Sequence, residues 1–195
     1  GANAFSGCTG LMSIAIPNTV TYIDDHAFHG CSLLSSIDLP DDISFIGDRV
    51  FEGCTSLDKI EVDSDNAYFR SIDGILFSKD LSILLRYPAA RSGEQYVVPN
   101  GVTILSNAAF EGCISLKELT LPEGLIIIGD YVFEGCDSLN RFNIPSTVEK
   151  FGLRPFSYRA YLSEDRFYEF DETGKLVNEQ GYNGLVEIGT DLYYA

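Results

Sequence analysis

A repeat of 23 residues runs through this sequence and constrains what the chain can fold into. Pro40 to Val62, PDDISFIGDRVFEGCTSLDKIEV, is one complete copy. In the first five copies a Phe is followed two residues later by Gly-Cys, and a Leu comes three residues after the Cys. A fixed period of this length is typical of solenoids, in which each copy forms one coil and stacks on the next. The Phe column comprises Phe5, Phe28, Phe51, Phe110, Phe133 and Phe156.

Each copy ends in a pattern that predicts a short strand. Apolar and polar residues alternate from Lys59 to Val62, which is the period of a strand with one buried face. The Pro that opens the next copy cannot donate a ladder hydrogen bond and therefore ends the strand. A second apolar set, Ile43, Ile46 and Phe51, is interrupted by glycines, which favours turns or short helical or 3-10 segments. We therefore predict an α/β solenoid with one short parallel strand per coil.

The repeat resembles the leucine-rich repeat family, specifically its bacterial surface-antigen, BspA-like type. The residues that carry the resemblance are IPNTVTYIDDHAFHGCSLLSSI, from Ile16 to Ile37, in which the Ile-Pro, Val, Ile, Ala-Phe, Gly-Cys, Leu and Ile columns agree together. Six copies, some of them partial, cover most of residues 2–167. The resemblance implies a leucine-rich repeat fold and an association with adhesion to host matrix proteins and to other cells.

The register of the repeat breaks once. Phe51 and Phe110 lie 59 residues apart, so residues 63–98 form an inserted or enlarged unit. Within this unit Ile75 to Phe77 and Ile83 to Leu85 flank a short polar stretch, which predicts a β-hairpin.

The repeat weakens toward the end of the chain, and we expect two regions. Residues 1–167 form the solenoid, with the irregular unit at 63–98, and its last copy, 145–167, is degraded. A terminal repeat needs a polar outer face, so residues 168–195 are predicted to be a C-terminal cap, an aromatic hairpin tail. This tail weakly resembles the aromatic hairpin repeats of Gram-positive cell-wall-binding modules. The chain starts within a copy, so we expect it to be a piece of a longer protein.

The charge of the chain restricts its partners. The net charge is −16, whereas nucleic acids and anionic membranes select basic surfaces. No apolar run approaches the length of a membrane span. We therefore expect no nucleic-acid partner and no membrane insertion in this part of the protein. The acidic charge and the family resemblance favour an extracellular or cell-surface location, with any signal and anchor outside this chain.

Five cysteines occupy one column of the repeat, so the coil sets their spacing. We interpret them as a row of small buried thiols, all free, because an odd number cannot pair fully and parallel side chains suit a disulfide poorly. His26 and His29 precede Cys31, but no fourth ligand accompanies them, so we do not predict a zinc site. No cofactor and no catalytic residues are predicted.

A group of oxygen-bearing side chains in the enlarged unit is a minor candidate for Ca²⁺. It lacks the Gly and the terminal Glu of a calcium loop, and Asp and Asn are also common turn formers. The residues are Asp63, Asp65, Asn66 and Asp73.

The polar positions of the predicted strands are the best candidate binding site. They should align as two rows on one surface, which solenoids commonly use for binding, and we call this surface the strand face. The alternative is a solvated sheet surface without a ligand. The candidate residues are Ser36, Asp38, Lys59, Glu61, Glu118, Thr120, Arg141 and Asn143.

Three functions are compatible with this sequence. The first is a non-catalytic secreted or cell-surface domain that mediates protein–protein contact or adhesion through the strand face. Its partner would be a protein or glycan on a host or neighbouring cell. The second is a structural spacer or scaffold for another domain, and the third is a contribution of the tail to cell-wall glycan binding. An enzyme is not predicted, because no acid–base constellation is evident.

Overall fold

The computed structural model describes residues 1–155 in full. From the rest of the chain it describes four strands by their backbone, β14 (Arg166–Phe170), β15 (Leu176–Gly181), β16 (Leu185–Ile188) and β17 (Asp191–Tyr194). β14 pairs with β15 and β16 with β17, both antiparallel, so the tail contains two hairpins. Residues 156–165, 171–175, 182–184, 189–190 and 195 lie outside the described residues. The boundary near residue 167 and the capping role of the tail therefore remain predictions.

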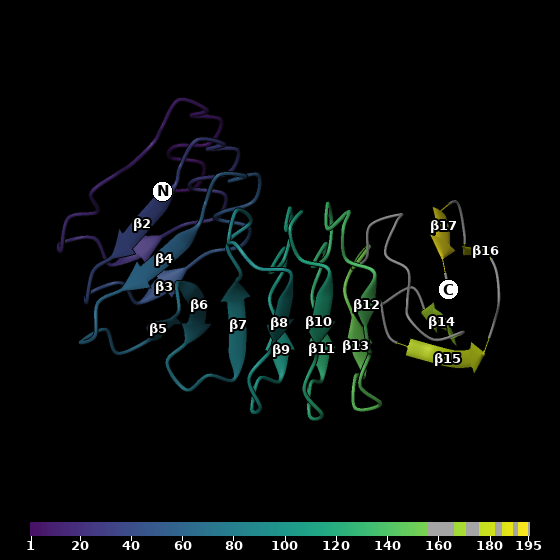
Figure 1. Ribbon diagram of the computed structural model, residues 1–195. Coiled ribbons are helices and arrows are strands. Elements are labelled where there is room, and N and C mark those ends of the chain that lie inside the picture. Colours follow the sequence, from purple (N-terminus) through teal and green to yellow (C-terminus); the bar gives the residue numbers. More distant parts are fainter. Residues whose placement is uncertain (156–165, 171–175, 182–184, 189–190, 195) are drawn as a thin grey trace.

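Each regular coil contributes two short parallel strands, where the sequence predicted one. The strands that end the copies form the first set, and Figure 1 shows its later members, β8, β10 and β12, next to one another. The first set comprises β2 (Ser36–Leu39), β4 (Lys59–Val62), β8 (Gln95–Val97), β10 (Glu118–Thr120) and β12 (Arg141–Phe142). The second set comprises β1 (Tyr22–Ile23), β3 (Phe45–Ile46), β7 (Ile83–Arg86), β9 (Ile104–Leu105), β11 (Ile127–Ile128) and β13 (Lys150–Phe151).

The α/β class with helical segments is not confirmed, because the described part of the chain contains no helix. Turns, which were the predicted alternative to helical segments, occupy the part of each coil around the Phe and Gly-Cys columns. Arg49 and Gly53, which flank Phe51, both have positive φ, 48° and 73°. The same two positions repeat as Ala108 and Gly112, with φ of 54° and 75°. Two left-handed residues within five positions are incompatible with a right-handed helix.

Backbone hydrogen bonds join each coil to the next. On the turn side, N–H groups donate to carbonyls 22 residues later, as Phe28 does to Val50 over 3.0 Å and Gly30 to Glu52 over 2.7 Å. On the side of the second strands the direction reverses, and Gly47 N–H donates back to the Ile23 carbonyl. The polar backbone of an inner coil is thus satisfied by its two neighbours, which is why single coils need a stack.

The core lies between the two strand sets and is built from the repeat columns. Phe28 and Phe51 stack with their rings nearly parallel and their centroids 6.0 Å apart. Phe110 and Phe133 also stack, with centroids 5.7 Å apart and an angle of 28° between the rings. The buried residues divide into two clusters, one around Phe28 and Phe51 and one around Phe110 and Phe133, and the enlarged unit contributes residues to both.

The predicted hairpin of the enlarged unit is confirmed and extended by one strand. β6 (Ile75–Ser78) pairs antiparallel with β7 as expected, and β5 (Phe69–Ile72) adds on the other side of β6. The β6–β7 loop is organised by Asp80, whose carboxylate accepts from the hydroxyls of Ser78 and Ser82. These bonds lower the pKa of Asp80 to about 2.

The end of the enlarged unit returns to the regular coil. Tyr87 takes the position of the Phe column and stacks on Phe110 at 5.1 Å, and β8 pairs with β10. The turn before Tyr87 is shorter than in the next coil. Leu84 aligns with Leu105, yet only three positions separate Leu84 from Tyr87 where five separate Leu105 from Phe110. The enlarged unit therefore cannot supply a full turn to stack on the coil before it.

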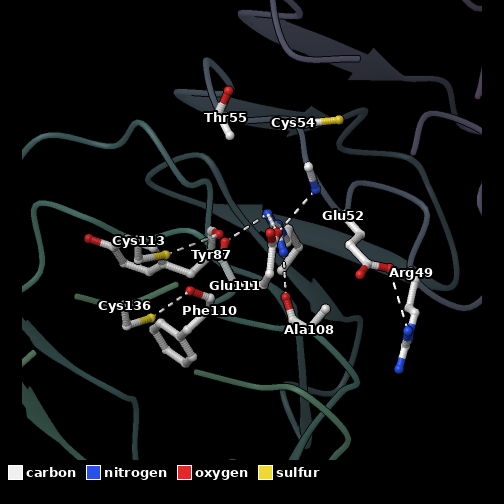
Figure 2. A network of polar contacts seen from close by, with 12 residues as sticks. Arg49, Glu52, Cys54, Thr55, Tyr87, Ala108, Phe110, Glu111, Cys113 and Cys136 are labelled. Carbon is white, nitrogen blue, oxygen red and sulfur yellow. Dashed lines mark hydrogen bonds and ion pairs between the residues drawn. The ribbon is translucent and has the colours of Figure 1, made fainter. Parts of the chain in front are cut away.

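Side chains bridge the break that this short turn leaves, as Figure 2 shows for Glu111 and its neighbours. The Gly53 N–H, which in a regular coil would donate to a backbone carbonyl, donates to the Glu111 carboxylate over 3.2 Å. Arg86, which is 3% exposed, forms an ion pair with Glu111 at 3.0 Å and also donates to the carbonyls of Ala108 and Glu111.

A second bridge crosses the break at an Asp/Asn column. In the regular coils the Asp25 carboxylate accepts from the Asp48 N–H, and the Asn107 carbonyl oxygen accepts from the Asp130 N–H, both at 2.7 Å. Asp48 has no regular coil after it, and its carboxylate accepts instead from the Asn107 amide at 3.0 Å. Asn107 thus has to accept on one side and donate on the other, which an amide does and an ionised carboxylate cannot.

We expect Asn107→Asp to destabilise the protein at neutral pH. The substitution keeps the acceptor for Asp130 but places a second carboxylate oxygen about 3 Å from that of Asp48, in place of the amide donor. The expected loss is about 1–3 kcal/mol in the free energy of unfolding, measured by urea denaturation. Part of this loss should be recovered as the pH falls toward 4, because one of the two carboxylates then becomes protonated.

The control is Asp25→Asn, which keeps the acceptor for the Asp48 N–H within the same column. It should leave the stability within about 0.5 kcal/mol of wild type, as is usual for exposed substitutions. A loss for Asn107→Asp no larger than that of the control would contradict a bridging role for Asn107.

Candidate functional site

The strand face is assembled as two separate halves. In the first half, Ser36 lies beside Lys59 and Asp38 beside Glu61, through the parallel register of β2 and β4. Lys59 and Glu61 form an ion pair at 3.7 Å, and both side chains are about half exposed. The structure therefore places these four predicted residues together on one surface.

A hollow of about 310 Å³ lies where β2 and β4 end. Asp38 and Glu61 line it together with Asp63, so three carboxyl groups surround the space. Its apolar wall is formed by Ile16, Leu39, Pro40 and Val62. Such a hollow offers an apolar contact next to a negative rim and suits a positively charged group of a partner.

The second half of the strand face contains Glu118, Thr120, Arg141 and Asn143. Arg141 pairs with Glu118 at 3.6 Å and is the most exposed of the charged residues in these ion pairs, with 70% of its side chain accessible. Asn143 follows β12 and is exposed. Its side-chain oxygen accepts from the Leu121 N–H at 3.5 Å.

Two members of this second half were not predicted from the sequence. Gln95 and Val97 lie in β8, opposite Glu118 and Thr120, and the Gln95 amide donates to Glu118 over 2.9 Å. Val97 is 67% exposed. The signal was available in the sequence, because both residues precede their neighbours in β10 by one repeat of 23 residues.

The enlarged unit separates the two halves. β4 is not paired with β8, and instead the Ile60 N–H donates to the carbonyl of Gly74 in the β5–β6 turn. Gly74 has a φ of 77° and sits so close to β4 that a Cβ atom there would lie 2.8 Å from that of Lys59. The predicted rows are therefore not continuous, because a hairpin turn lies against the edge of β4.

A second exposed column was also missed, on the outer side of the second strands. Tyr22 and Phe45 lie side by side with ring centroids 5.8 Å apart, and they are 64% and 43% exposed. Ile104 and Ile127 occupy the same position in the later coils. In the sequence each of these residues lies between two buried apolar residues of the repeat. Its exposure could not be predicted from the pattern, because the second strand that turns it outward was not predicted.

The four candidate calcium residues do not form one group. Asn66 is fully buried, and its amide donates to the carbonyls of Pro40 and Ile43 while its oxygen accepts from two backbone N–H groups. The Asp63 carboxylate accepts from the Asp65 N–H in a local turn. Asn66 thus holds the start of the enlarged unit against the coil before it. Within residues 1–155 no three His, Cys, Asp or Glu side chains have an arrangement that could hold a metal ion.

Hydrogen bonds from the thiols to carbonyls of the preceding coil account for the position of the cysteine column. Four of the five free thiols are buried, and Cys8 is exposed. Each buried thiol donates to the carbonyl of the residue 26 positions earlier, as Cys54 does to Phe28 over 3.1 Å and Cys136 to Phe110 over 3.0 Å. Burial raises the pKa of Cys54 to about 12 and that of Cys113 well above its usual value. These thiols are therefore poor nucleophiles and poor metal ligands.

We expect only Cys8 to react quickly with a thiol-specific reagent in the native protein. The other four thiols are buried and should react only after unfolding, when all five become accessible. The measurement is a thiol titration with and without denaturant, without prior reduction, and Cys8→Ser should abolish the fast phase. Three or fewer thiols in the denatured, unreduced protein would contradict the assignment of five free cysteines.

The raised pKa of Cys54 predicts a loss of stability in alkali. In the unfolded chain this thiol ionises near pH 9.0, whereas in the folded protein it keeps its proton up to about pH 12. The folded state therefore binds the extra proton between these values, and the free energy of unfolding falls as the pH rises, by up to ~1.4 kcal/mol per pH unit. Urea denaturation at several pH values should show a shallower fall for Cys54→Ser, because serine does not ionise. An unchanged slope would contradict the prediction.

The comparisons with known proteins agree with this geometry. The model of the BspA type leucine-rich repeat region matches residues 1–84 and 89–188, in six copies. The chain is similar in structure to the pneumococcal vaccine antigen PcpA, with 26% identity and a TM-score of 0.75. This match covers 82% of this chain and 46% of the antigen.

Two further solved structures are similar. A leucine-rich cell surface protein of Faecalibacterium prausnitzii A2-165 has 26% identity and a TM-score of 0.65, over 80% of this chain and 48% of that protein. A leucine-rich repeat protein of Eubacterium ventriosum has 23% identity and a TM-score of 0.63, over 77% and 52%, and supports the fold alone. The chain thus spans about half the length of these proteins. No curated protein sequence is similar enough to count as a match.

The described residues contain no helix of the length and apolar character that crossing a membrane requires. The repeat columns, the stacked coils and the family match over most of the sequence lead to one assignment. The chain belongs to the BspA-type leucine-rich repeat family.

Proposed function

We propose that this chain is a non-catalytic binding domain of a bacterial cell-surface protein, which contacts a protein or glycan partner through the strand face. The observation that carries the proposal is the hollow at the end of β2 and β4, because two predicted binding residues, Asp38 and Glu61, line it. A concave, partly apolar space with a few charged groups is the usual form of a recognition site.

The charges of the strand face are not needed for the stability of the fold. The pairs Lys59–Glu61 and Arg141–Glu118 are exposed at the surface. Exposed ion pairs contribute roughly 0–1 kcal/mol, so these residues could be replaced at little cost to stability. Opposite charges in fixed positions do favour one partner over another, which supports a role in recognition.

The family and the similar structures support a location at the cell surface. PcpA is described as a vaccine antigen, and the Faecalibacterium prausnitzii protein as a cell surface protein. We extend this location to the present chain. We also propose that it has no catalytic activity, since the buried thiols have raised pKa values and the family is one of repeat domains.

The proposal is tested by binding of the protein to immobilised matrix proteins, mucins and cell-wall glycans, measured by surface plasmon resonance. We expect saturable binding to at least one of these surfaces. Glu61→Lys and Arg141→Glu should each weaken it several-fold, because Glu61 lines the hollow and reversing a charge at an interface introduces repulsion. Lys150→Glu is the matched control, since Lys150 is exposed on a strand of the second set and should not affect binding.

Other outcomes would assign a different function. Binding that survives both reversals but is lost when residues 168–195 are removed from a chain that still folds would favour the tail and its proposed role in glycan binding. No saturable binding on any surface, with cooperative unfolding retained, would favour the structural spacer.

A further inference from the structure

The break in the solenoid leaves the second edge of β3 without a partner strand. β9 pairs with β7 and β11, and β11 pairs with β9 and β13, so each has neighbours on both sides. β3 pairs only with β1, because β7 turns to pair with β6 and β9. The backbone of Phe45 and Ile46 therefore has a second edge to which no strand of the described chain is added. An open edge of this kind is a template for an extended segment of another chain.

A cavity of about 470 Å³ lies beside this edge, and we call it the junction groove. Its apolar lining comes from both sides of the break and includes Phe45, Ile46, Leu76, Leu85, Ile104 and Ile127. The volume lies within the roughly 300–1,000 Å³ that is usual for ligand sites. Phe45 is 43% exposed although it is a large aromatic residue, so the groove presents apolar surface that the chain itself does not cover.

The polar residues of the junction groove have an excess of negative charge. Arg86 is neutralised by Glu111 at 3.0 Å. Arg49 lies 3.9 Å from Asp48 and 3.7 Å from Glu52, so a single cation faces two carboxylates. Asp25 adds a further carboxylate to the lining. A partner that carries a positive charge is therefore favoured at this site.

We propose that the junction groove binds an extended peptide segment of a partner protein, which pairs with the open edge of β3. The segment places an apolar side chain against Phe45 and Ile104 and a Lys or Arg beside the carboxylates of Asp48 and Glu52. Main-chain hydrogen bonds supply part of the affinity, and the apolar and basic side chains supply the selectivity. This site uses the second strands and is separate from the strand face.

The experiment begins with a display library of random heptapeptides selected on the wild-type protein. We expect the enriched peptides to share an apolar residue next to a Lys or Arg. Their affinity, measured by fluorescence anisotropy, should fall about tenfold or more for Phe45→Ser, as for other anchors at the centre of an interface. Tyr68→Ser is the matched control. Tyr68 is an exposed aromatic residue that does not line the groove, so its replacement should leave the affinity unchanged.

Ile104→Ser is a second groove variant, in case Phe45→Ser does not fold. Thermal unfolding shows whether each of the two variants is folded. A further measurement needs no protein variant. Two versions of a selected peptide are made, one methylated at the odd-numbered backbone nitrogens and one at the even-numbered ones. Only one version should lose binding, since successive N–H groups of a strand point to opposite sides. The proposal would be overturned if no peptides are enriched or if the enriched peptides are acidic. It would also be overturned if the peptides bind the groove variants as well as wild type, or if both methylated versions still bind.

Reversal of charge on the strand face separates this proposal from the function proposed above. Glu61→Lys and Arg141→Glu should leave binding of the selected peptides unchanged. If they weakened it as much as Phe45→Ser does, the peptides would occupy the strand face and the proposed groove site would be wrong.

Discussion

Backbone hydrogen bonds between successive coils are the interaction on which the rest of this structure depends. They run in one direction on the turn side, as from Phe28 to Val50, and in the other direction beside the second strands, as from Gly47 to Ile23. Each coil must therefore present its donors and acceptors at the same height as its neighbour, which forces the equivalent side chains into columns. The Phe stacks follow from this alignment, and the buried thiols occupy the remaining space with bonds to carbonyls of the preceding coil.

The enlarged unit shows what happens when one coil cannot meet this requirement. Its turn is too short, so side chains replace the missing backbone bonds, with Glu111 accepting from Gly53 and Asn107 donating to Asp48. Arg86 completes the arrangement from the buried side. A buried ion pair of this kind adds little net stability compared with an apolar pair, but removing one partner is costly, typically about 3–5 kcal/mol. The break is thus held in place by a few residues that the regular coils do not need.

The same break shapes the surfaces that are available for binding. It divides the strand face into two halves, because the β5–β6 turn lies against β4. On the opposite strand set it opens the junction groove and leaves β3 with a free edge. A solenoid with six regular coils would have two continuous sheets and neither of these features. Recognition in this protein is therefore expected where the repeat is interrupted as well as along its strands.

The 23-residue period by itself determined the coil, the first strands and the Phe and Cys columns, which are buried in the second to fifth copies, because these depend on spacing that every copy repeats. The hairpin of the enlarged unit followed from two apolar runs around a short polar stretch, which is a local pattern. The period did not determine the second strands, since a parallel pair only two residues long is stable only when stacked coils supply its partners. The residues of the strand face could be named from alternation, but their division into two halves could not. The roles of Asn107, Arg86 and Phe45 were decided by tertiary structure alone, because they arise where coils far apart in the sequence meet across a turn that is too short.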